Sequence, residues 1–504
     1  MENIPILTAI VFAPFIGAGV IALFIRDHSK VRIWSLCFVV IELLLCLIAF
    51  FSYERLHPDQ FQLVDKSDNW ISFSKYTLSY HLGVDGISLP LVLLNGILGV
   101  VAVMASWKIA YKVPKYFALL LVLQGAVMGV FTSLDLILFF IFWEIELVPM
   151  YFLISQWGSG RKEYSAMKFL IFTFLGSAFM FIGIIGVALS VGSFNIDGLA
   201  ELVRNNDAAF IIPQAIIFGL LFIGFAVKLP VWPIHTWLPD AHTDAPTAAS
   251  VMLAGVLLKM GGYGILRLCV SLFPEVMLDG AGHILIVAGM INVIYGALIT
   301  LRQTDLKRLI AFSSISHMGL VLIGIASLNV NSSHIGLTGA SMQMFTHGTI
   351  TGLMFLVVGF IYEKTHTRHI PDLGGLAARM PIISIVFVIA GLASLGLPGT
   401  SGFVSELLVF VGTFPIWQWY TGIAAFGIVI TAGYILWMIE RTLFREPRER
   451  FSDIKDASRF EMIPMLLLLF VIIAVGVYPS IISDLFNEGS IEIMQNAIAS
   501  VQVN

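Results

Sequence analysis

The stretch FAVKLPVWPIHTWLPDAH, residues 225–242, places Lys228 inside the apolar run 211–231 and follows it with Pro230 and Pro233. A charged side chain in the middle of a membrane span costs roughly 2.5 to 3.5 kcal/mol on insertion scales, so it rarely persists without a use. Proline lacks a backbone donor and interrupts a helix. The stretch therefore predicts a broken membrane helix beside a buried charge.

The composition of the whole chain is that of a membrane protein. Its 504 residues are 58% hydrophobic and 12% charged, and the mean hydropathy is +0.93, whereas soluble domains carry about 25% charged residues. The net charge of -4 says little about partners, because most charges lie between apolar runs. The first apolar run has no basic region ahead of it and is long enough to span, so we expect a membrane helix rather than a cleaved signal.

Apolar runs long enough to cross about 30 Å of hydrocarbon recur along the chain and predict fourteen spans in an all-α polytopic membrane protein. The spans cover residues 4–25, 33–52, 86–107, 115–134, 136–156, 166–191, 211–234, 247–271, 281–301, 306–327, 334–362, 381–412, 417–440 and 461–479.

The basic residues alternate between the two sides of this array. If the N-terminus is outside, Lys228 and Lys259 lie within spans and nearly all other basic residues fall in inner loops. Since inner loops of membrane proteins are enriched in Lys and Arg, the bias predicts that both termini are on the outer side. One inner loop, 235–246, has no basic residue at all. The basic residues assigned to the outer side are Arg55, Lys66, Lys75, Arg204 and Arg267.

Ionisable residues near the midpoints of spans form a short set: Glu144, Lys228, Lys259, His347 and Glu406. Each lies near the centre of its own span, so all five are expected at one depth. A row of acids and bases at one depth suits lateral proton transfer, because moving an opposite charge changes how tightly a buried group holds its proton. The alternative is a set of buried ion pairs that only fix helix packing.

Other ionisable residues carry less weight. Glu146 is two residues from Glu144 and therefore about 200° around a regular helix, so we expect it to bond a neighbouring helix. Glu42 fits packing as well as a relay. His317, in SSISHMG, either extends a hydrogen-bonded chain or is satisfied by packing.

The loop without basic residues holds His235, Asp240, His242 and Asp244. Such residues can bind metal ions, but metal-binding histidines are usually paired at a fixed spacing on one element, and here prolines interrupt the stretch. We expect a proton entrance or a capping network instead, with His235 as a secondary candidate for the relay.

No motif for electron transfer is visible. A Rossmann glycine fingerprint and a nucleotide loop are both missing, and the cysteines are widely spaced without a CxxC pair, so neither an iron–sulfur cluster nor a zinc site is encoded. The cysteines, expected to be inert, are Cys37, Cys46 and Cys269.

A second break resembles the first. In LGLPGTSGFVSE, residues 395–406, Pro398 and several glycines precede Glu406. Interrupted helices at corresponding places in two halves are typical of transporters built from repeats. Five spans separate the breaks, and an odd number of helices per unit makes two units inverted, so spans four to eight and nine to thirteen form the predicted pair. The expected divisions are 1–114, 115–271 (first repeat), 272–443 (second repeat) and 444–504 (inner loop and last span).

Four stretches carry a resemblance to a known family: FFIFWEIELVPMYFLI (139–154), FAVKLPVWPIHTWLPDAHTDAPTAASVMLAGVLLKMGGYG (225–264), LKRLIAFSSISHMG (306–319) and LPGTSGFVSE (397–406). They are similar to the antiporter-like subunits of respiratory complex I, a family shared with multisubunit cation/proton antiporters and membrane-bound hydrogenases. Glu406, the segment YHLGVDGISLPLVLL (80–94) and a chain that ends soon after its last span, without a long lateral helix, are similar to the M-type branch, related to mitochondrial subunit 4.

The resemblance implies a proton-translocating subunit of a bacterial NADH:quinone oxidoreductase, which is an enzyme complex in the inner membrane. In this family the acid at Glu144 pairs with Lys228, Lys259 is the central relay, and Glu406 leads to the exit. NADH, FMN, iron–sulfur clusters and quinone are expected in partner subunits and no cofactor in this chain; neighbouring antiporter-like subunits and the bilayer are the expected partners. The alternatives are the D-type subunit of a sodium/proton antiporter and a membrane subunit of a hydrogenase-type complex.

Overall fold

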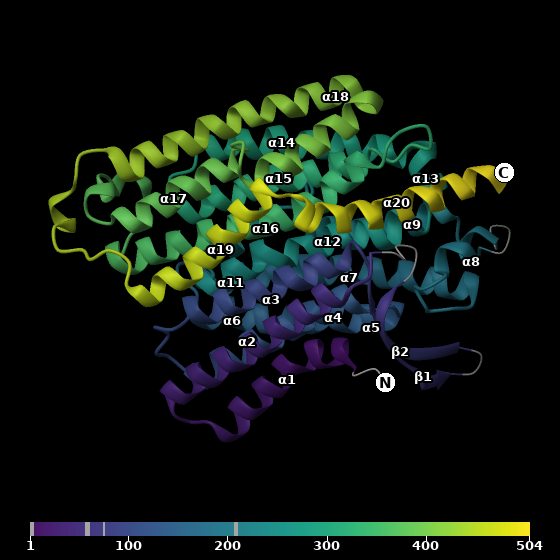
Figure 1. Cartoon of the computed structure of the whole chain (residues 1–504), viewed down its shortest axis with the longest axis horizontal. Coiled ribbons are helices and arrows are strands. Elements are labelled where there is room, and N and C mark those ends of the chain that lie inside the picture. Colours follow the sequence, from purple (N-terminus) through teal and green to yellow (C-terminus); the bar gives the residue numbers. More distant parts are fainter. Residues whose placement is uncertain (1–4, 56–60, 74–75, 206–209, 504) are drawn as a thin grey trace.

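Long helices laid side by side make up most of the chain (Figure 1). The structure is a computed structural model that describes residues 5–55, 61–73, 76–205 and 210–503, so Lys75 lies outside the described residues. In the first half the elements are α1 (Ile6–Phe24), α2 (His28–Ser52), β1 (Gln62–Phe73), β2 (Tyr76–Val84), α3 (Ser88–Ala105), α4 (Val113–Thr132), α5 (Leu136–Ile145), α6 (Leu147–Trp157), α7 (Lys162–Val191), α8 (Leu199–Asn205), α9 (Gln214–Lys228), α10 (Trp237–Asp244), α11 (Thr247–Met252) and α12 (Leu258–Gly264).

The second half continues in the same manner. Its helices are α13 (Pro274–Val276), α14 (Gly282–Leu301), α15 (Leu306–Ile325), α16 (Ile335–Thr365), α17 (Pro381–Ser394), α18 (Ser401–Ile439), α19 (Arg459–Val477) and α20 (Ser480–Val503). Short π-helical segments cover Leu253–Leu257, Ile265–Val270, Met277–Ala281 and Glu440–Phe444. Single 3₁₀ turns cover Ile370–Asp372, Leu376–Ala378 and Glu449–Phe451.

The predicted all-α polytopic membrane fold is confirmed. Twelve helical stretches of the described residues are long and apolar enough to cross a membrane, and two shorter apolar helices, α9 and α17, accompany them. These two are short because each ends at a predicted break, α9 at Lys228 and α17 at Ser394. α18 contains one non-helical residue, Gln418, where the chain turns between two helical parts. The total of fourteen spans stays a prediction.

Two elements fall outside the predicted spans. β1 and β2 form an antiparallel hairpin between α2 and α3. α20 follows α19 and packs against α3, α13 and α16; it occupies the short stretch expected after the last predicted span. Polar residues interrupt the apolar runs in both segments, and a search for spans therefore passes over them.

The loops gather at two ends of the molecule. At one end Arg32 donates a hydrogen bond to the carbonyl of Ile109 at 2.9 Å. Lys108, in the same loop, binds the Glu461 carboxylate at 2.6 Å, and Lys364 binds it at 3.0 Å. Loops that are far apart in sequence and were all predicted to be basic and inner therefore share one end.

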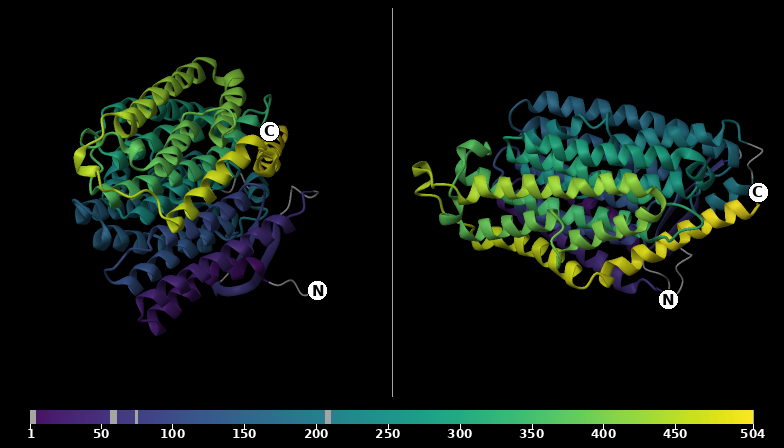
Figure 2. Two further views of the ribbon diagram at one scale, coloured as in Figure 1. Left: turned by 60° about the vertical axis from the view of Figure 1, so that its left-hand side comes forward. Right: turned by 90° about the horizontal axis from the view of Figure 1, so that it is seen from above.

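The opposite end holds the hairpin, and both termini lie toward it (Figures 1 and 2). Asp85, between β2 and α3, forms a buried ion pair with Arg267 of the last turns before α13. Arg267 lies in the π-helical segment Ile265–Val270, within the predicted span 247–271 and near its hairpin end. His334 binds Asn487 of α20 at 2.8 Å. These contacts attach α20 and the hairpin to the helices at this end.

α16 lies at the centre of the bundle (Figure 1). All residues from Gly336 to Ile361 are buried, and helices from both halves of the chain surround them, including α3, α11, α15, α18 and α19. Small residues such as Gly348 permit this packing, because a Cβ there would lie 2.6 Å from the Gly255 carbonyl oxygen. His347 is therefore presented from a helix that is buried along nearly its whole length.

Candidate functional site

Lys228 is the last residue of α9, and its ammonium forms an ion pair with the carboxylate of Glu146. Both side chains are fully enclosed, at 1% and 0% exposure. The predicted contact between Lys228 and Glu144 is therefore wrong in this structure, while the prediction that Glu146 bonds a neighbouring helix is confirmed.

Pro149 explains this difference. Proline cannot donate its backbone N–H to the carbonyl four residues earlier and clashes with it, and that carbonyl belongs to Ile145. α5 accordingly ends at Ile145, α6 begins at Leu147, and Glu146 lies at the junction. The angle of about 200° between Glu144 and Glu146 assumes a regular helix, which the chain does not form here.

Glu144 lies close by without a direct bond to the lysine. One of its carboxylate oxygens is buried and has no hydrogen-bond partner among the described residues. Aromatic rings line the Lys228 side: its Nζ is 5.4 Å from the ring centroid of Trp143 and 5.5 Å from that of Phe169. The rings stabilise a cation by their quadrupole and exclude water.

Lys259 has different partners. Its Nζ lies 2.7 Å from Nδ1 of His347 and also donates to the carbonyl of Ala254. The side chain is completely buried, and no carboxylate of the described residues forms an ion pair with it. A hydrogen bond to a neutral imidazole requires that one of the two groups donates and the other accepts, so the contact is a place where one proton is shared.

The helix around Lys259 is continuous but not regular. α12 lies between π-helical turns at Leu253–Leu257 and Ile265–Val270. The expected unbroken helix is therefore a helix with two widened parts. Such π turns are often found at functional sites, and here the first of them contains Ala254, whose carbonyl binds the lysine.

His317 connects His347 to Glu406. Its ring centroid is 5.5 Å from that of His347, and its Nε2 is 3.7 Å from Oε1 of Glu406. Both ring nitrogens face backbone carbonyls, Nδ1 that of Ser313 at 2.8 Å and Nε2 that of Ser394 at 2.9 Å. A carbonyl only accepts, so both bonds form only when the ring is doubly protonated. That form is a cation beside the Glu406 carboxyl.

Polar side chains enclose the space between these groups. A cavity of about 10 Å³ touches His317, His347 and Glu406, which is about the volume that one water needs. Gln343, one helical turn before His347, lines the same cavity and accepts a hydrogen bond from Ser405 at 2.5 Å. Sequence reasoning did not single out Gln343, although its spacing from His347 on α16 is a usable signal.

The second break brings backbone next to Glu406. Gly396 has a φ of +79°, and a Cβ at this position would lie 2.6 Å from Oε2 of Glu406. Only glycine combines this backbone conformation with so close an approach. The break therefore positions Glu406, the last of the side chains that lead from Lys259 through His347 and His317.

The loop 235–246 has no basic residue of its own, but basic side chains from other helices contact it. Asp240 pairs with Lys168 of α7 at 2.8 Å and with Arg308 of α15 at 3.6 Å. Lys307 donates to the carbonyl of Ala245 at 2.6 Å. The exception in the charge pattern thus has a structural reason, because neighbouring elements supply the positive charges.

The other candidates in that loop point to separate partners. His235 lies 3.3 Å from the Tyr295 hydroxyl, His242 stacks on a phenylalanine ring, and Asp244 accepts from Ser165 at 2.6 Å. Within the described part of the chain, no group of three or more His, Cys, Asp or Glu residues is placed to hold a metal ion.

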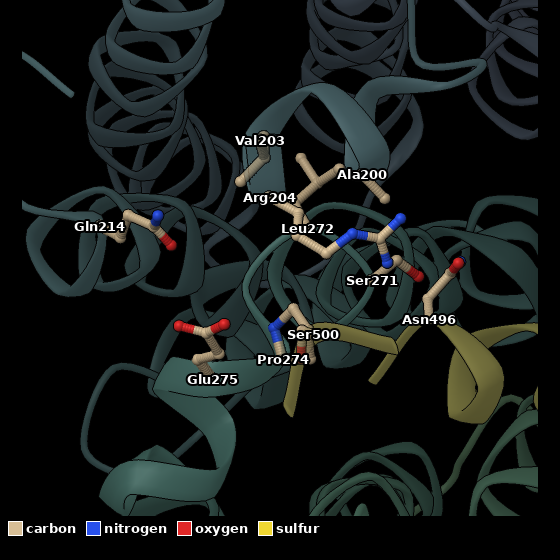
Figure 3. A pocket seen from close by; sticks show the side chains of 10 residues that line it. All are labelled: Ala200, Val203, Arg204, Gln214, Ser271, Leu272, Pro274, Glu275, Asn496 and Ser500. Carbon is tan, nitrogen blue, oxygen red and sulfur yellow. The ribbon is translucent and has the colours of Figure 1, made fainter. Parts of the chain in front are cut away.

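Glu42, a second cavity and the cysteines lie apart from the side chains that lead from Lys259 to Glu406. Glu42 on α2 accepts a hydrogen bond from Gln124 on α4. A cavity of about 30 Å³ lies among α8, α13 and α20 (Figure 3). Arg204 and Asn496 line it, and none of the mid-helix acids and bases does. The cysteines are free, with Cys37 exposed and the other two buried.

The fold and the enclosed acids and bases define a multi-pass membrane protein with a buried line of acidic and basic side chains. Comparison with known proteins agrees with that class and narrows it. The chain belongs to the family described as NADH:quinone oxidoreductase/Mrp antiporter, whose transmembrane pattern matches residues 133–431.

Relatives and solved structures extend the similarity over the whole chain. The chain is 41% identical to NAD(P)H-quinone oxidoreductase chain 4 1 of Synechococcus elongatus, covering 96% of this chain and 91% of the relative. It is 37% identical to NADH-quinone oxidoreductase subunit M of Rhodobacter capsulatus, covering 98% and 97%. In fold it matches a chain of respiratory complex I from Thermus thermophilus (TM-score 0.85, 24% identity, 99% of each chain). It also matches a chain of the Mrp complex from Dietzia (TM-score 0.85, 20% identity, 99% and 100% covered).

Proposed function

We propose that this chain is a proton-translocating membrane subunit of an NADH:quinone oxidoreductase, of the M or chain 4 type. Relatives that bear these names match nearly its full length. The observation that carries the proposal is the contact series from Lys259 through His347 and His317 to Glu406. The chain then acts without a redox centre of its own, and NADH, FMN, iron–sulfur clusters and quinone belong to partner subunits.

The side chains take distinct roles in the proposed cycle. Lys259 receives a proton from the basic end and shares it with His347 across 2.7 Å. One water or a ring rotation passes it to His317, and Glu406 accepts it for release. Lys228 controls this step from a distance, because opening or closing its ion pair changes the positive charge near Lys259. With the ion pair closed, as in this structure, Lys228 binds Glu146. When that pair opens, Glu144 is the second acid to which Lys228 can bind.

The proposal also assigns the orientation. The basic end faces the inside of a bacterial inner membrane, and both termini face the outside. Residues 115–271 and 272–443 form two inverted five-helix units, each with one interrupted helix. Neighbouring antiporter-like subunits are the proposed partners within the membrane.

The test is NADH-driven proton translocation by the whole enzyme in liposomes. We expect Lys259→Met to lower the number of protons moved per NADH while quinone reduction continues. Lys228→Ala and Glu144→Ala abolish translocation through this subunit in an assembled complex, and Glu406→Gln blocks release. Lys455→Met, which changes an exposed lysine at the basic end, is the matched control. Unchanged proton counts in the Lys259 and Lys228 variants would refute the relay.

A second candidate follows from the family itself, whose description includes Mrp antiporters. In that case the chain is the D-type subunit of a sodium/proton antiporter. Liposomes with a sodium gradient and no NADH separate the two functions: proton movement under these conditions supports the antiporter and none supports the oxidoreductase subunit.

A further inference from the structure

A long furrow runs between α1 and α4, which pack against each other. Its volume is about 670 Å³, within the range of about 300 to 1,000 Å³ typical of ligand sites. Small and apolar residues from both helices line it, among them Gly19, Ala22, Ala118 and Leu119. The furrow exists because these side chains are too short to fill the space between two helices.

The furrow adjoins exposed apolar side chains of α1. Ile16 and Leu23 of α1 are 59% and 70% exposed. Large apolar side chains on the surface of a membrane helix face lipid or another membrane helix. The apolar part of the furrow is therefore suited to an acyl chain.

One end of the furrow carries positive charge. Arg26, at the end of α1, and Lys112 and Lys115, at the start of α4, line it there and are exposed. Among the described residues, no carboxylate forms an ion pair with any of the three. Asp27 is the nearest acid in sequence, and it accepts a hydrogen bond from the backbone of Lys30 as the cap of α2.

The two basic segments are held in place. The hydrogen bond from Arg32 to Ile109 joins the first turns of α2 to the loop before α4. The ammonium of Lys115 lies 4.8 Å from the Phe152 ring centroid, and that of Lys112 lies 4.9 Å from the Tyr111 ring centroid. All three cations line the furrow where α1 ends and α4 begins, which places positive charge for a phosphate beside an apolar path for an acyl chain.

We propose that this furrow binds an anionic phospholipid, with its phosphate at Arg26, Lys112 and Lys115 and one acyl chain between α1 and α4. Basic side chains at the membrane surface attract anionic lipids, and Arg and Lys bind phosphate oxygens by charge-assisted hydrogen bonds. A zwitterionic lipid brings a cationic amine along with its phosphate and so offsets less of the positive charge, and an apolar partner helix offers no counter-charge at all. The proposal does not depend on proton translocation.

Photo-crosslinking of a lipid to the assembled enzyme in bilayer nanodiscs tests the site. The probe is phosphatidylglycerol with a diazirine in its acyl chain, and peptide mapping by mass spectrometry locates the label. We expect label on α1 and α4. Removing each charge weakens binding about fivefold, so the triple variant Arg26→Gln, Lys112→Gln, Lys115→Gln loses on the order of a hundredfold.

A second variant blocks the furrow without touching the charges. A Cβ at Gly19 meets no atom within 4 Å, so Gly19→Leu places its side chain in the furrow without a clash and abolishes the label. Gly433→Leu is the matched control, because Gly433 is an exposed glycine of α18 with equally open surroundings, and it leaves the label unchanged. A normal thermal midpoint confirms folding of each variant.

Competition identifies the headgroup. If the site is selective for anionic lipids, unlabelled phosphatidylglycerol displaces the probe, and so does a lipid with two phosphate groups. Unlabelled phosphatidylethanolamine does not displace it. Equal labelling by a phosphatidylethanolamine probe overturns the proposal, since the furrow then holds any annular lipid. Crosslinks from α1 and α4 to another polypeptide in place of lipid overturn it as well. If the triple variant does not assemble, Gly19→Leu and the competition still decide.

Discussion

Lys228 and Lys259 are both fully buried lysines, but their surroundings differ in kind. Lys228 has a carboxylate partner, Glu146, and aromatic rings around it. Lys259 has a histidine and a backbone carbonyl. A charge with a buried counter-charge is strongly held, because separating such a pair leaves an uncompensated ion. A lysine bonded to a neutral ring exchanges a proton without creating a new pair of charges.

The comparison indicates a division of tasks between the two lysines. The Lys228 site is suited to holding charge, and it lies where α9 ends and the chain turns. The line from Lys259 to Glu406 is suited to moving charge, and it combines successive acidic and basic side chains with a cavity for about one water. Four predictions test this division.

The largest effect is expected at the ion pair. Glu146→Ala leaves the Lys228 ammonium without its counter-charge and lowers the free energy of unfolding by about 3 to 5 kcal/mol. Glu144→Ala changes it by only about 1 kcal/mol or less, since Glu144 forms no ion pair with the lysine and one of its carboxylate oxygens has no hydrogen-bond donor. Thermal and chemical unfolding of the solubilised enzyme measure both. Equal losses in the two variants would show that the acids share the lysine.

The next effect concerns proton movement and not stability. His317→Ala removes the ring between His347 and Glu406 and lowers the rate of translocation on the order of a hundredfold, which is the lower range for loss of a positioned acid–base group. His235→Ala is the control, because His235 is also a buried histidine but lies outside the line. Proton counts per NADH in liposomes distinguish them. A normal count for His317→Ala would remove it from the path.

Some features of the fold and the site can be predicted from the sequence, and others cannot. Apolar runs predict the membrane helices, and prolines predict both breaks, because each effect acts locally. The pairing of Lys228 was predicted wrongly for a local reason as well: Pro149 is visible in the sequence, and its effect on the carbonyl of Ile145 moves Glu146 away from its regular position. The contact between Lys259 and His347 joins residues on different helices, and only tertiary packing sets its distance.

The hydroxyl groups beside the line are expected to matter less. Thr346 and Ser405 are 2.8 Å apart, and Ser405 donates to Gln343. Ser405→Ala removes both hydrogen bonds and lowers stability by about 1 kcal/mol, with a loss in translocation of a few fold at most. Thr413→Val, which removes a hydroxyl bound to the backbone of α18, is the control. Translocation as low as in His317→Ala would instead place Ser405 on the proton path.

The smallest effect is confined to acid pH and concerns the ion pair at the hairpin end. Burial alone would raise the pKa of the Asp85 carboxyl, but the Arg267 guanidinium beside it outweighs burial and holds this pKa below its ordinary value of 3.8. The pair therefore stabilises the fold fully above pH 3.8, and the contribution is lost as pH falls through the lower pKa of the folded state.

Thermal midpoints between pH 6 and pH 3 test this expectation. Asp85→Asn keeps the oxygen that accepts from the backbone of Ser88 and loses the charge, so its midpoint is lower at neutral pH and falls less steeply in acid. At neutral pH the number of protons per NADH is unchanged in the variant. An altered proton count would show that the hairpin end of the molecule also takes part in proton translocation.

The enclosed position of α16 sets a limit on how fast the protein can work. A helix that touches neighbours from both halves of the chain moves only if they move too, since protein interiors are close-packed. Collective helix shifts take microseconds to milliseconds, whereas side-chain rotations are faster. His347 can therefore change partners by turning its ring many times before the bundle rearranges once. If turnover requires such a helix shift, it is no faster than the shift itself, however quickly the ring turns.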